Sequence, residues 1–192
     1  MARQKEFDRD VALAEAIKVF ASHGYEGAST ETLLRRMGIS RQSMYDTFGD
    51  KRRLYLDALQ QYVSRSTADI IAAMHSAPSP LKGLEAALMN IVSRPASEPF
   101  EGCLGVSAVC EYGQSDRDVS KMTDASGATL LSAFEGIIVK GKAAGEVAAD
   151  VEVKAMALFM RALLSGLKVS ARAGATPESL RKIVRVALRS LH

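Results

Sequence analysis

The sequence predicts an all-α protein of about nine helices. Apolar residues recur every three or four positions along almost the whole chain, as on one face of a helix, and the alternating Val, Ile and Thr runs typical of strands are missing. Ser, Thr or Asp precedes several of these segments and Gly or Pro follows them, as at helix boundaries. With 192 residues, 47% of them hydrophobic, the chain can bury one sizeable core or two smaller ones.

Four helices are predicted in the first 75 residues. Their approximate ranges are 7–22, 30–37, 41–48 and 51–74. Ser29, Ser40 and Asp50 stand where a side-chain oxygen can accept hydrogen bonds from the free amides at the start of the second, third and fourth helices. Gly24 is placed to close the first helix in the left-handed conformation.

Five further helices are predicted beyond residue 75. Proline breaks at 78–80 and 95–99 enclose a short helix with Leu84, Leu88 and Ile91 on one side. The next predicted helices span about 103–112, 116–144 and 150–173. The last helix begins after Thr176 and Pro177, and its predicted apolar face consists of Leu180, Ile183, Val184, Ala187 and Leu191.

The two long helices predicted at about 116–144 and 150–173 differ in how strongly the sequence favours a continuous helix. Asp116 can start the first and Asp150 can cap the second. Gly127, Gly136 and Gly141 each weaken the first helix by about 1 kcal/mol relative to Ala, so a kink or break is expected there.

The second and third helices have the length and spacing of a helix-turn-helix. Each is about eight residues long, and Met37, Gly38 and Ile39 form the short turn between them. Two-turn helices are unstable alone, so their apolar side chains are expected to pack on the first helix. This leaves a polar face on the third helix for the major groove of DNA: Arg41, Gln42, Ser43, Tyr45 and Thr47.

The local distribution of charge, rather than the net charge of the chain, favours a polyanionic partner. The formal net charge is only +3. Between Arg35 and Arg53, however, six basic residues stand against two acidic ones, Asp46 and Asp50. A local excess of +4 in nineteen residues is suited to phosphate contact.

The segment STETLLRRMGISRQSMYDTFGDKRRLY, residues 29–55, resembles the DNA-binding motif of the TetR family of bacterial transcription regulators. The resemblance implies a three-helix DNA-binding head at 1–50 and a C-terminal ligand-binding and dimerisation domain at 51–192, connected by the helix at about 51–74. It also implies a homodimeric regulator, more often a repressor, which binds a palindromic double-stranded operator and is released by an unidentified small-molecule effector.

Residue roles follow from the same resemblance. It implies that Arg41, Gln42 and Ser43 meet bases or nearby phosphates, that Tyr45 and Lys51 hold the DNA backbone, and that the start of the second helix presents amides and hydroxyls at Ser29 and Thr30. Gln can bond an adenine edge and Arg a guanine edge, each with two hydrogen bonds. Two residues depart from the family pattern: Gln42 replaces a Gly or Pro common in relatives, and Asp46 brings a carboxylate that repels phosphate.

The C-terminal part carries a sensor hypothesis. The stretch GCLGVSAVCEYG near residue 102 looks like a TetR subgroup with Gly-Cys at the start of its sixth helix, which includes sensors of electrophiles and oxidants. Cys103 at a helix N-terminus can favour the thiolate, and Lys168 is the candidate to assist it. A buried structural thiol and a surface lysine are the alternatives.

Dimerisation is predicted through the last two helices, as a four-helix bundle made by two copies. Small residues on the first of these helices permit close approach: Ala157, Ala162, Ser165, Gly166 and Val169. Apolar residues on the second supply the packing face: Leu180, Val184, Ala187 and Leu188.

Other function classes find no support in the sequence. The longest run without a charged residue is Ile70–Leu81, too short for a membrane span, and the charged N-terminus lacks a secretory signal, so a cytoplasmic location is expected. His23, His75 and His192 have no metal-ligand spacing, and no catalytic or cofactor motif is found. We expect no enzyme activity, cofactor or metal. The alternative functions are a thiol-sensing repressor acting through Cys103, or a helical interaction module without strong operator binding.

Overall fold

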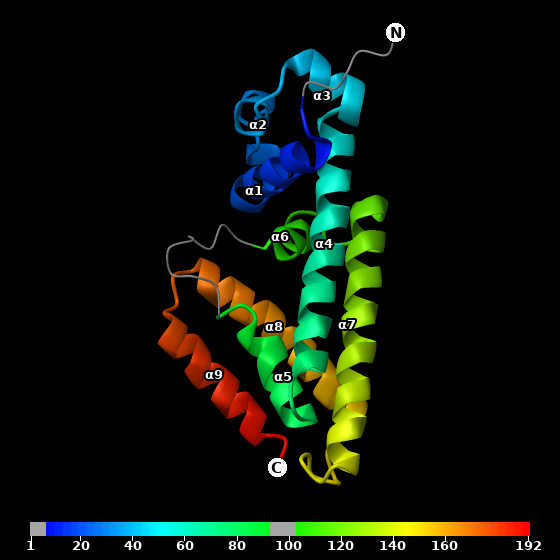
Figure 1. The fold of residues 1–192 in the computed structure, drawn as a ribbon, viewed down its shortest axis with the longest axis vertical. Helices are drawn as coiled ribbons and strands as arrows, with labels where there is room; N and C mark the ends of the chain where they lie inside the picture. Colours follow the sequence, from blue (N-terminus) through cyan, green and yellow to red (C-terminus); the bar gives the residue numbers. More distant parts are fainter. Residues whose placement is uncertain (1–6, 93–102) are drawn as a thin grey trace. The chain divides into compact units, whose positions relative to one another are not determined.

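The computed structural model describes residues 7–92 and 103–192, and within these ranges the chain is helical with no strand (Figure 1). The all-α prediction is confirmed. The helices of the described ranges are α1 (Arg9–Gly27), α2 (Thr30–Met37), α3 (Arg41–Phe48), α4 (Lys51–Ser76), α5 (Pro80–Met89), α6 (Leu104–Tyr112), α7 (Arg117–Ala143), α8 (Val153–Arg172) and α9 (Pro177–Arg189). The break predicted at 95–99 lies outside the described residues.

Most predicted helix boundaries are confirmed, and two are corrected. The regular helix of α1 is interrupted at Gly24, which has the predicted positive φ of 71°, but its ψ of −177° is extended and a further helical turn follows to Gly27. α8 is capped by Glu152 rather than Asp150. The Glu152 carboxylate accepts hydrogen bonds from the N–H groups of Lys154 and Ala155, because it stands directly before the first helical residue.

The kink or break predicted in α7 is not found: Arg117–Ala143 is one helix. Its apolar stripe is buried in the C-terminal half of the helix at Leu130, Phe134 and Ile138. Gly141 is itself buried, and a Cβ there would lie 2.7 Å from Val147 Cγ2, so its lack of a side chain allows close packing. Tertiary packing therefore outweighs the low helix propensity of glycine in this helix.

The chain forms two compact units. Among the described residues, unit 1 contains 7–63 and 103–123, and unit 2 contains 64–92 and 124–192. α4 and α7 each contribute one part to both units. The units therefore do not divide at residue 50, and the functional division expected there stays a proposal.

Unit 1 has a core made by α1–α3, the first half of α4, and α6. Its largest fully buried side chains are Phe20, Leu33, Met44, Leu54, Tyr55, Leu59 and Leu104. Leu13 and Phe20 of α1 belong to the same cluster as Leu33 of α2 and Met44 of α3. The predicted packing of α2 against α1 is confirmed, and the apolar side chains of α3 are buried in the same core.

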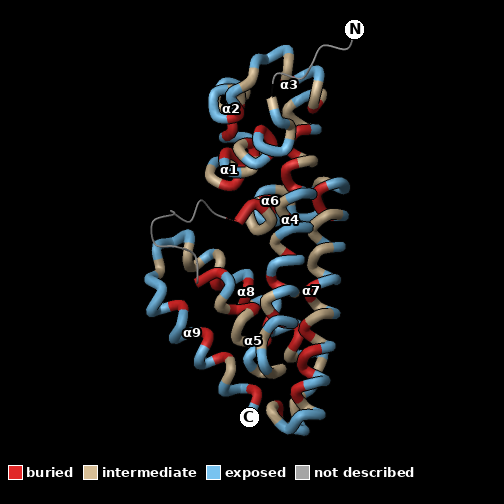
Figure 2. The backbone as a smooth tube through the Cα atoms, in the orientation of Figure 1, coloured by how far each residue is buried: buried red, intermediate tan, exposed pale blue. Residues whose placement is uncertain are grey.

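Unit 2 is built around aliphatic side chains of α5, α7, α8 and α9, with the second half of α4. Buried positions recur along α9 between exposed ones (Figure 2). Leu180, Val184 and Ala187 are buried, as predicted, but Ile183 is 39% exposed. Spacings of four and three residues keep the buried positions on one stripe, and Ile183 lies beside that stripe.

Candidate nucleic-acid interface

A short turn joins α2 and α3, and local caps hold its geometry. The Ser29 side chain accepts a hydrogen bond from a backbone N–H in the first turn of α2. Gly38 ends α2 in the left-handed region, with φ 67°, and its N–H donates to the Leu34 carbonyl. Ser40 then caps α3 by accepting a hydrogen bond from the N–H three residues later. The predicted helix-turn-helix is therefore present.

The two faces of α3 differ sharply. Met44 and Phe48 are buried in the core of unit 1. Arg41, Gln42 and Tyr45 are exposed on the helix, and Tyr45 retains 46% of its accessible surface. A tyrosine this open is not a core residue, so α3 presents a polar face of hydrogen-bonding groups to solvent.

The remaining predicted contact residues flank this face. Ser43 and Thr47 are half-buried on α3, at its start and end. Ser29 is exposed and Thr30 half-buried at the N-terminus of α2. The structure places all four in the helix-turn-helix, and their contact with DNA stays a prediction.

Lys51 opens α4 and is held by an aromatic ring. Its ammonium nitrogen lies 4.3 Å from the centroid of the Tyr25 ring. Tyr25 directly follows the turn at Gly24, and the start of α4 is capped by Asp50, which accepts from the Arg53 N–H at 2.7 Å. The cation–π contact restricts a long flexible side chain near the end of α3.

Part of the local positive charge is neutralised within unit 1. Arg36 lies 3.3 Å from a Glu15 carboxylate oxygen, and Arg52 lies 2.6 Å from one of Asp116. The hydrogen bond from Arg52 lowers the pKa of Asp116 below its ordinary value. The charge available to a phosphate backbone is therefore smaller than the sequence count of this segment suggests.

One contact in this region was not predicted from the sequence. Glu111, in the last turn of α6, accepts hydrogen bonds from the N–H groups of Tyr25 and Glu26, both at 3.1 Å. The ring of Tyr112 lies 6.4 Å from that of Tyr25. The partners are more than 80 residues apart in the chain, and no local pattern marks such a pairing.

Two family models match the sequence. The model described as bacterial regulatory proteins, tetR family, matches residues 12–58, and that described as tetracyclin repressor-like, C-terminal domain, matches residues 80–187. The chain belongs to the TetR family. The resemblance inferred from residues 29–55 is confirmed, and the molecule is a helix-turn-helix regulatory protein.

Similar TetR-family and helix-turn-helix proteins align over nearly the whole chain. The uncharacterized HTH-type transcriptional regulator YezE of Bacillus subtilis (strain 168) is 30% identical over 192 residues, covering 98% of each chain. The HTH-type transcriptional repressor ComR of Escherichia coli (strain K12) is 28% identical, covering 97% of this chain and 90% of ComR. A cysteine-substituted variant of the TetR family transcriptional regulator CifR, complexed with 26bp double-strand operator DNA, superposes with a TM-score of 0.86 at 32% identity over 100% of both chains.

The predicted sensor residues of this TetR-family protein lie in different units. Cys103 directly precedes α6 in unit 1 and is 5% exposed, so the thiol is buried. Lys168 is half-buried on α8 in unit 2. Cys110, which was not proposed as a sensor, is the exposed thiol. The Gly-Cys subgroup stays a prediction, and Gly102 lies outside the described residues.

The residues predicted for the dimer interface of the TetR-family chain fall into buried and exposed groups, and the interface itself stays a prediction. Leu180, Val184 and Ala187 of α9 are buried in the core of their own unit, and Leu188 packs against that core. These residues form the one apolar stripe of α9, and this stripe is turned toward the core. Ala157, the first predicted position of α8, is buried as well. In contrast, the remaining predicted positions of α8 are exposed: Ala162, Ser165, Gly166 and Val169. Leu158, Phe159 and Val186 are also large exposed apolar residues on these helices.

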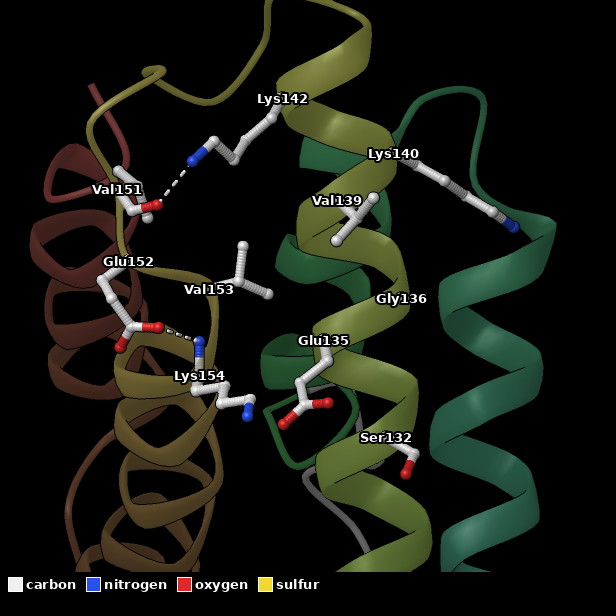
Figure 3. A pocket seen from close by; sticks show the side chains of 10 residues that line it. All are labelled: Ser132, Glu135, Gly136, Val139, Lys140, Lys142, Val151, Glu152, Val153 and Lys154. Atoms are coloured by element: carbon white, nitrogen blue, oxygen red, sulfur yellow. Dashed lines mark hydrogen bonds between the residues drawn. The ribbon is translucent and has the colours of Figure 1, made fainter.

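A surface pocket of about 770 Å³ lies in unit 2, where α7 ends and α8 begins (Figure 3). Lys142 reaches across it and donates to the Val151 carbonyl at 2.7 Å. Glu152 is turned to the α8 N-terminus as its cap. Neither Cys103 nor Lys168 lines this pocket, so it does not link a predicted sensor residue to a ligand.

Within the described residues, no group of three His, Cys, Asp or Glu side chains is arranged to hold a metal ion. Among the helices of the same residues, none has the length and apolar character needed to cross a membrane.

Proposed function

We propose that this protein is a transcriptional repressor that binds a palindromic operator as a homodimer, with α3 of each copy in the major groove. The observation that carries the proposal is the two-sided α3: Met44 and Phe48 anchor it in the core, and its opposite face presents Arg41, Gln42 and Tyr45 to solvent. A rigidly seated helix with exposed donors and acceptors is suited to reading base edges.

The proposed contacts divide into base readers and phosphate binders. Arg41 and Gln42 have side chains long enough to reach base edges, supported by Ser43 and Thr47. Tyr45 and Lys51 hold the backbone, together with the N-terminus of α2 at Ser29 and Thr30. Helix N-termini favour phosphate because their amides and dipole point toward the anion.

A homodimer is proposed because one two-turn helix covers only a few base pairs. Two copies related by a dyad read two half-sites about 34–36 Å apart. The exposed apolar positions of α8 and α9 are the surface available for this contact: Leu158, Phe159, Ala162, Val169, Ile183 and Val186. Most lie on α8, so we assign the larger share of the interface to that helix.

Release by a small-molecule effector is part of the proposal, and unit 1 supplies a route for it. Glu111 ties the last turn of α6 to the backbone at Tyr25, whose ring contacts Lys51. Arg52, which follows Lys51 in the chain, forms an ion pair with Asp116 at the start of α7. A ligand that favours another position of α6 would therefore also change the setting of α4 at the DNA contact, in proportion to its preference between the two states.

The test is binding of the dimer to duplexes from a randomised library, followed by titration at several salt concentrations. We expect enrichment of a palindrome, and we expect Lys51→Ala to weaken binding to every duplex and to lower the salt slope by about one per half-site. Lys121→Ala is the matched control, since Lys121 is exposed in the same unit on α7. Equal effects of both variants would remove Lys51 from the contact set, and no enriched sequence would refute operator binding.

A further inference from the structure

We propose that Asp46 sets the base preference of Gln42, so that the two residues together read an adenine in each half-site. Asp46 is thus a positioning residue that acts through Gln42. This inference rests on the proposed function, because a base preference requires operator binding. It goes beyond that function by naming the base and the group that excludes its competitor.

The two side chains are already joined on the reading face of α3. Gln42 Nε2 donates a hydrogen bond to Asp46 Oδ1 at 2.8 Å. The residues are one helical turn apart, a spacing at which side chains meet. Both are exposed, so the bond is made on the solvent side of the helix.

The chemistry of the carboxylate fixes the orientation of the amide. An ionised Asp has only acceptor oxygens, so the amide nitrogen of Gln42, which carries both donor hydrogens, must face Asp46. An amide turned by 180° would place its oxygen against the carboxylate. With one N–H engaged by Asp46, Gln42 presents one acceptor, Oε1, and one remaining N–H to a partner.

This pattern matches one base edge in the major groove and not its closest competitor. Adenine offers an acceptor at N7 and a donor at N6, which pair with the free N–H and Oε1 of Gln42. Guanine offers two acceptors, N7 and O6, and needs two donors. A free glutamine can supply two N–H groups, but a glutamine held by Asp46 cannot, so Asp46 acts against guanine.

Asp46 is an acidic side chain on the face of α3 that we propose contacts DNA, so its presence there needs an explanation. Among the described ion pairs, none includes Asp46, so its charge is not neutralised by a neighbouring cation. A carboxylate near phosphates weakens binding to every sequence. A contribution to base selectivity through Gln42 explains why an acidic side chain stands at a position where it lowers the affinity for DNA.

The experiment is a selection from a library randomised through the half-site, with the full-length dimer and Asp46→Ala, Gln42→Ala and the double variant. We expect the wild type to favour adenine over guanine at one position by about fivefold or more. Asp46→Ala should lower that ratio at least threefold at the same position, and Gln42→Ala should abolish it. The double variant should behave like Gln42→Ala, because Asp46 acts through Gln42.

Glu31→Ala is the charge-matched control. Glu31 is exposed in the first turn of α2, in the same unit. Both acidic substitutions should strengthen binding to all duplexes by relieving repulsion from phosphate, but Glu31→Ala should leave the adenine-to-guanine ratio unchanged.

Three results would overturn the inference. An unchanged ratio in Asp46→Ala would show that Gln42 is oriented without Asp46. A change confined to a different position, with lost preference for cytosine, would show that Asp46 reads a base directly. A wild type that enriches no sequence would remove the proposed function itself, whereas in the first two cases the enriched palindrome would leave that function standing.

Discussion

The outward faces of α3 and α8 differ, although each helix has its other face in a core. On α3, the solvent side carries polar groups such as Arg41, Gln42 and Tyr45. On α8, it carries Leu158, Phe159 and small residues. A hydrated, charged partner requires hydrogen-bonding groups, whereas a protein partner gains from apolar surface removed from water. The difference supports the proposal that unit 1 contacts DNA and that unit 2 contacts a second copy.

The cores of the two units differ in a related way. Unit 1 contains an aromatic group, Phe20, Tyr25, Tyr55 and Tyr112, in which Phe20 and Tyr55 lie 5.1 Å apart between ring centroids. Burial raises the pKa of Tyr112 to about 12, and that of Tyr55 also rises. Unit 2 relies on aliphatic side chains and Phe134. Directional ring contacts join α1, α4 and α6 in unit 1, whereas aliphatic packing in unit 2 depends on close fit.

The largest expected effect concerns the apolar face of unit 2. Phe159→Arg should raise the dissociation constant of the dimer at least about 30-fold, as for a central interface aromatic, because a charge would be buried between copies. Operator affinity should fall with it, since a monomer reads one half-site. Sedimentation velocity and operator titration measure both effects.

Val139→Arg is the matched control for this comparison. Val139 is 53% exposed on α7 in the same unit, and it lies outside the proposed interface. A dimer weakened equally by both substitutions would show that general surface charge, rather than the α8 face, controls association. A Phe159→Arg protein that remains a tight dimer would place the interface elsewhere.

A smaller effect tests how closely unit 2 is packed. A Cβ at Gly83 would clash with the Ile137 side chain and lie 2.7 Å from the Met74 carbonyl oxygen, whereas one at Gly136 would meet nothing within 4 Å. Gly83→Ala should lower the free energy of unfolding by about 1–3 kcal/mol through overpacking. Gly136→Ala should raise it by roughly 0.5–1 kcal/mol, because Ala has the higher helix propensity.

Urea denaturation of both variants measures these changes. Substitutions with the same sign would mean that helix propensity, and not close fit, dominates at both glycines. Such a result would remove the contrast drawn between the two cores.

Local signals in the sequence predicted much of the head. Ser29, Gly38 and Ser40 act within one helical turn of themselves, so their caps could be read from adjacent residues. The polar face of α3 followed from helical periodicity in the same way.

Contacts between distant segments were not accessible to the same reasoning. The hydrogen bonds from Tyr25 and Glu26 to Glu111 depend on how α6 meets α1 in space. Periodicity identified the apolar stripe of α9, and in the structure Leu180 and Val184 are buried in the core of their own unit. A pattern of apolar residues predicts that a helix face is buried, but it does not distinguish burial in the chain's own core from burial against another copy. The Glu152 cap was missed because Asp150, two residues earlier, belongs to a residue type that caps helices more often than Glu does.

The smallest effect concerns the polar contacts of unit 1. Arg52 donates to Asp116 and lowers the pKa of that carboxyl below its ordinary 3.8, and Asp116 also accepts from the N–H groups of Asp118 and Val119. A carboxyl with a lower pKa in the folded than in the unfolded chain stabilises the fold above about pH 4, and this stabilisation is lost as the pH falls through the folded-state value. The side chains of Arg52 and Asp116 are 30% and 21% exposed, so water screens the ion pair. Its contribution to the free energy of unfolding should therefore stay below about 1 kcal/mol.

Asp116→Asn isolates this charge, because Asn retains an acceptor oxygen for the start of α7. Its deficit in unfolding free energy relative to wild type should be present at pH 6 and should shrink as the pH falls below about 4. Chemical denaturation across this range measures the deficit. A deficit that is independent of pH would mean that the geometry of the cap, rather than the ion pair with Arg52, accounts for the role of Asp116. The contrast between a unit held by charge contacts and one held by close packing would then no longer apply at this end of α7.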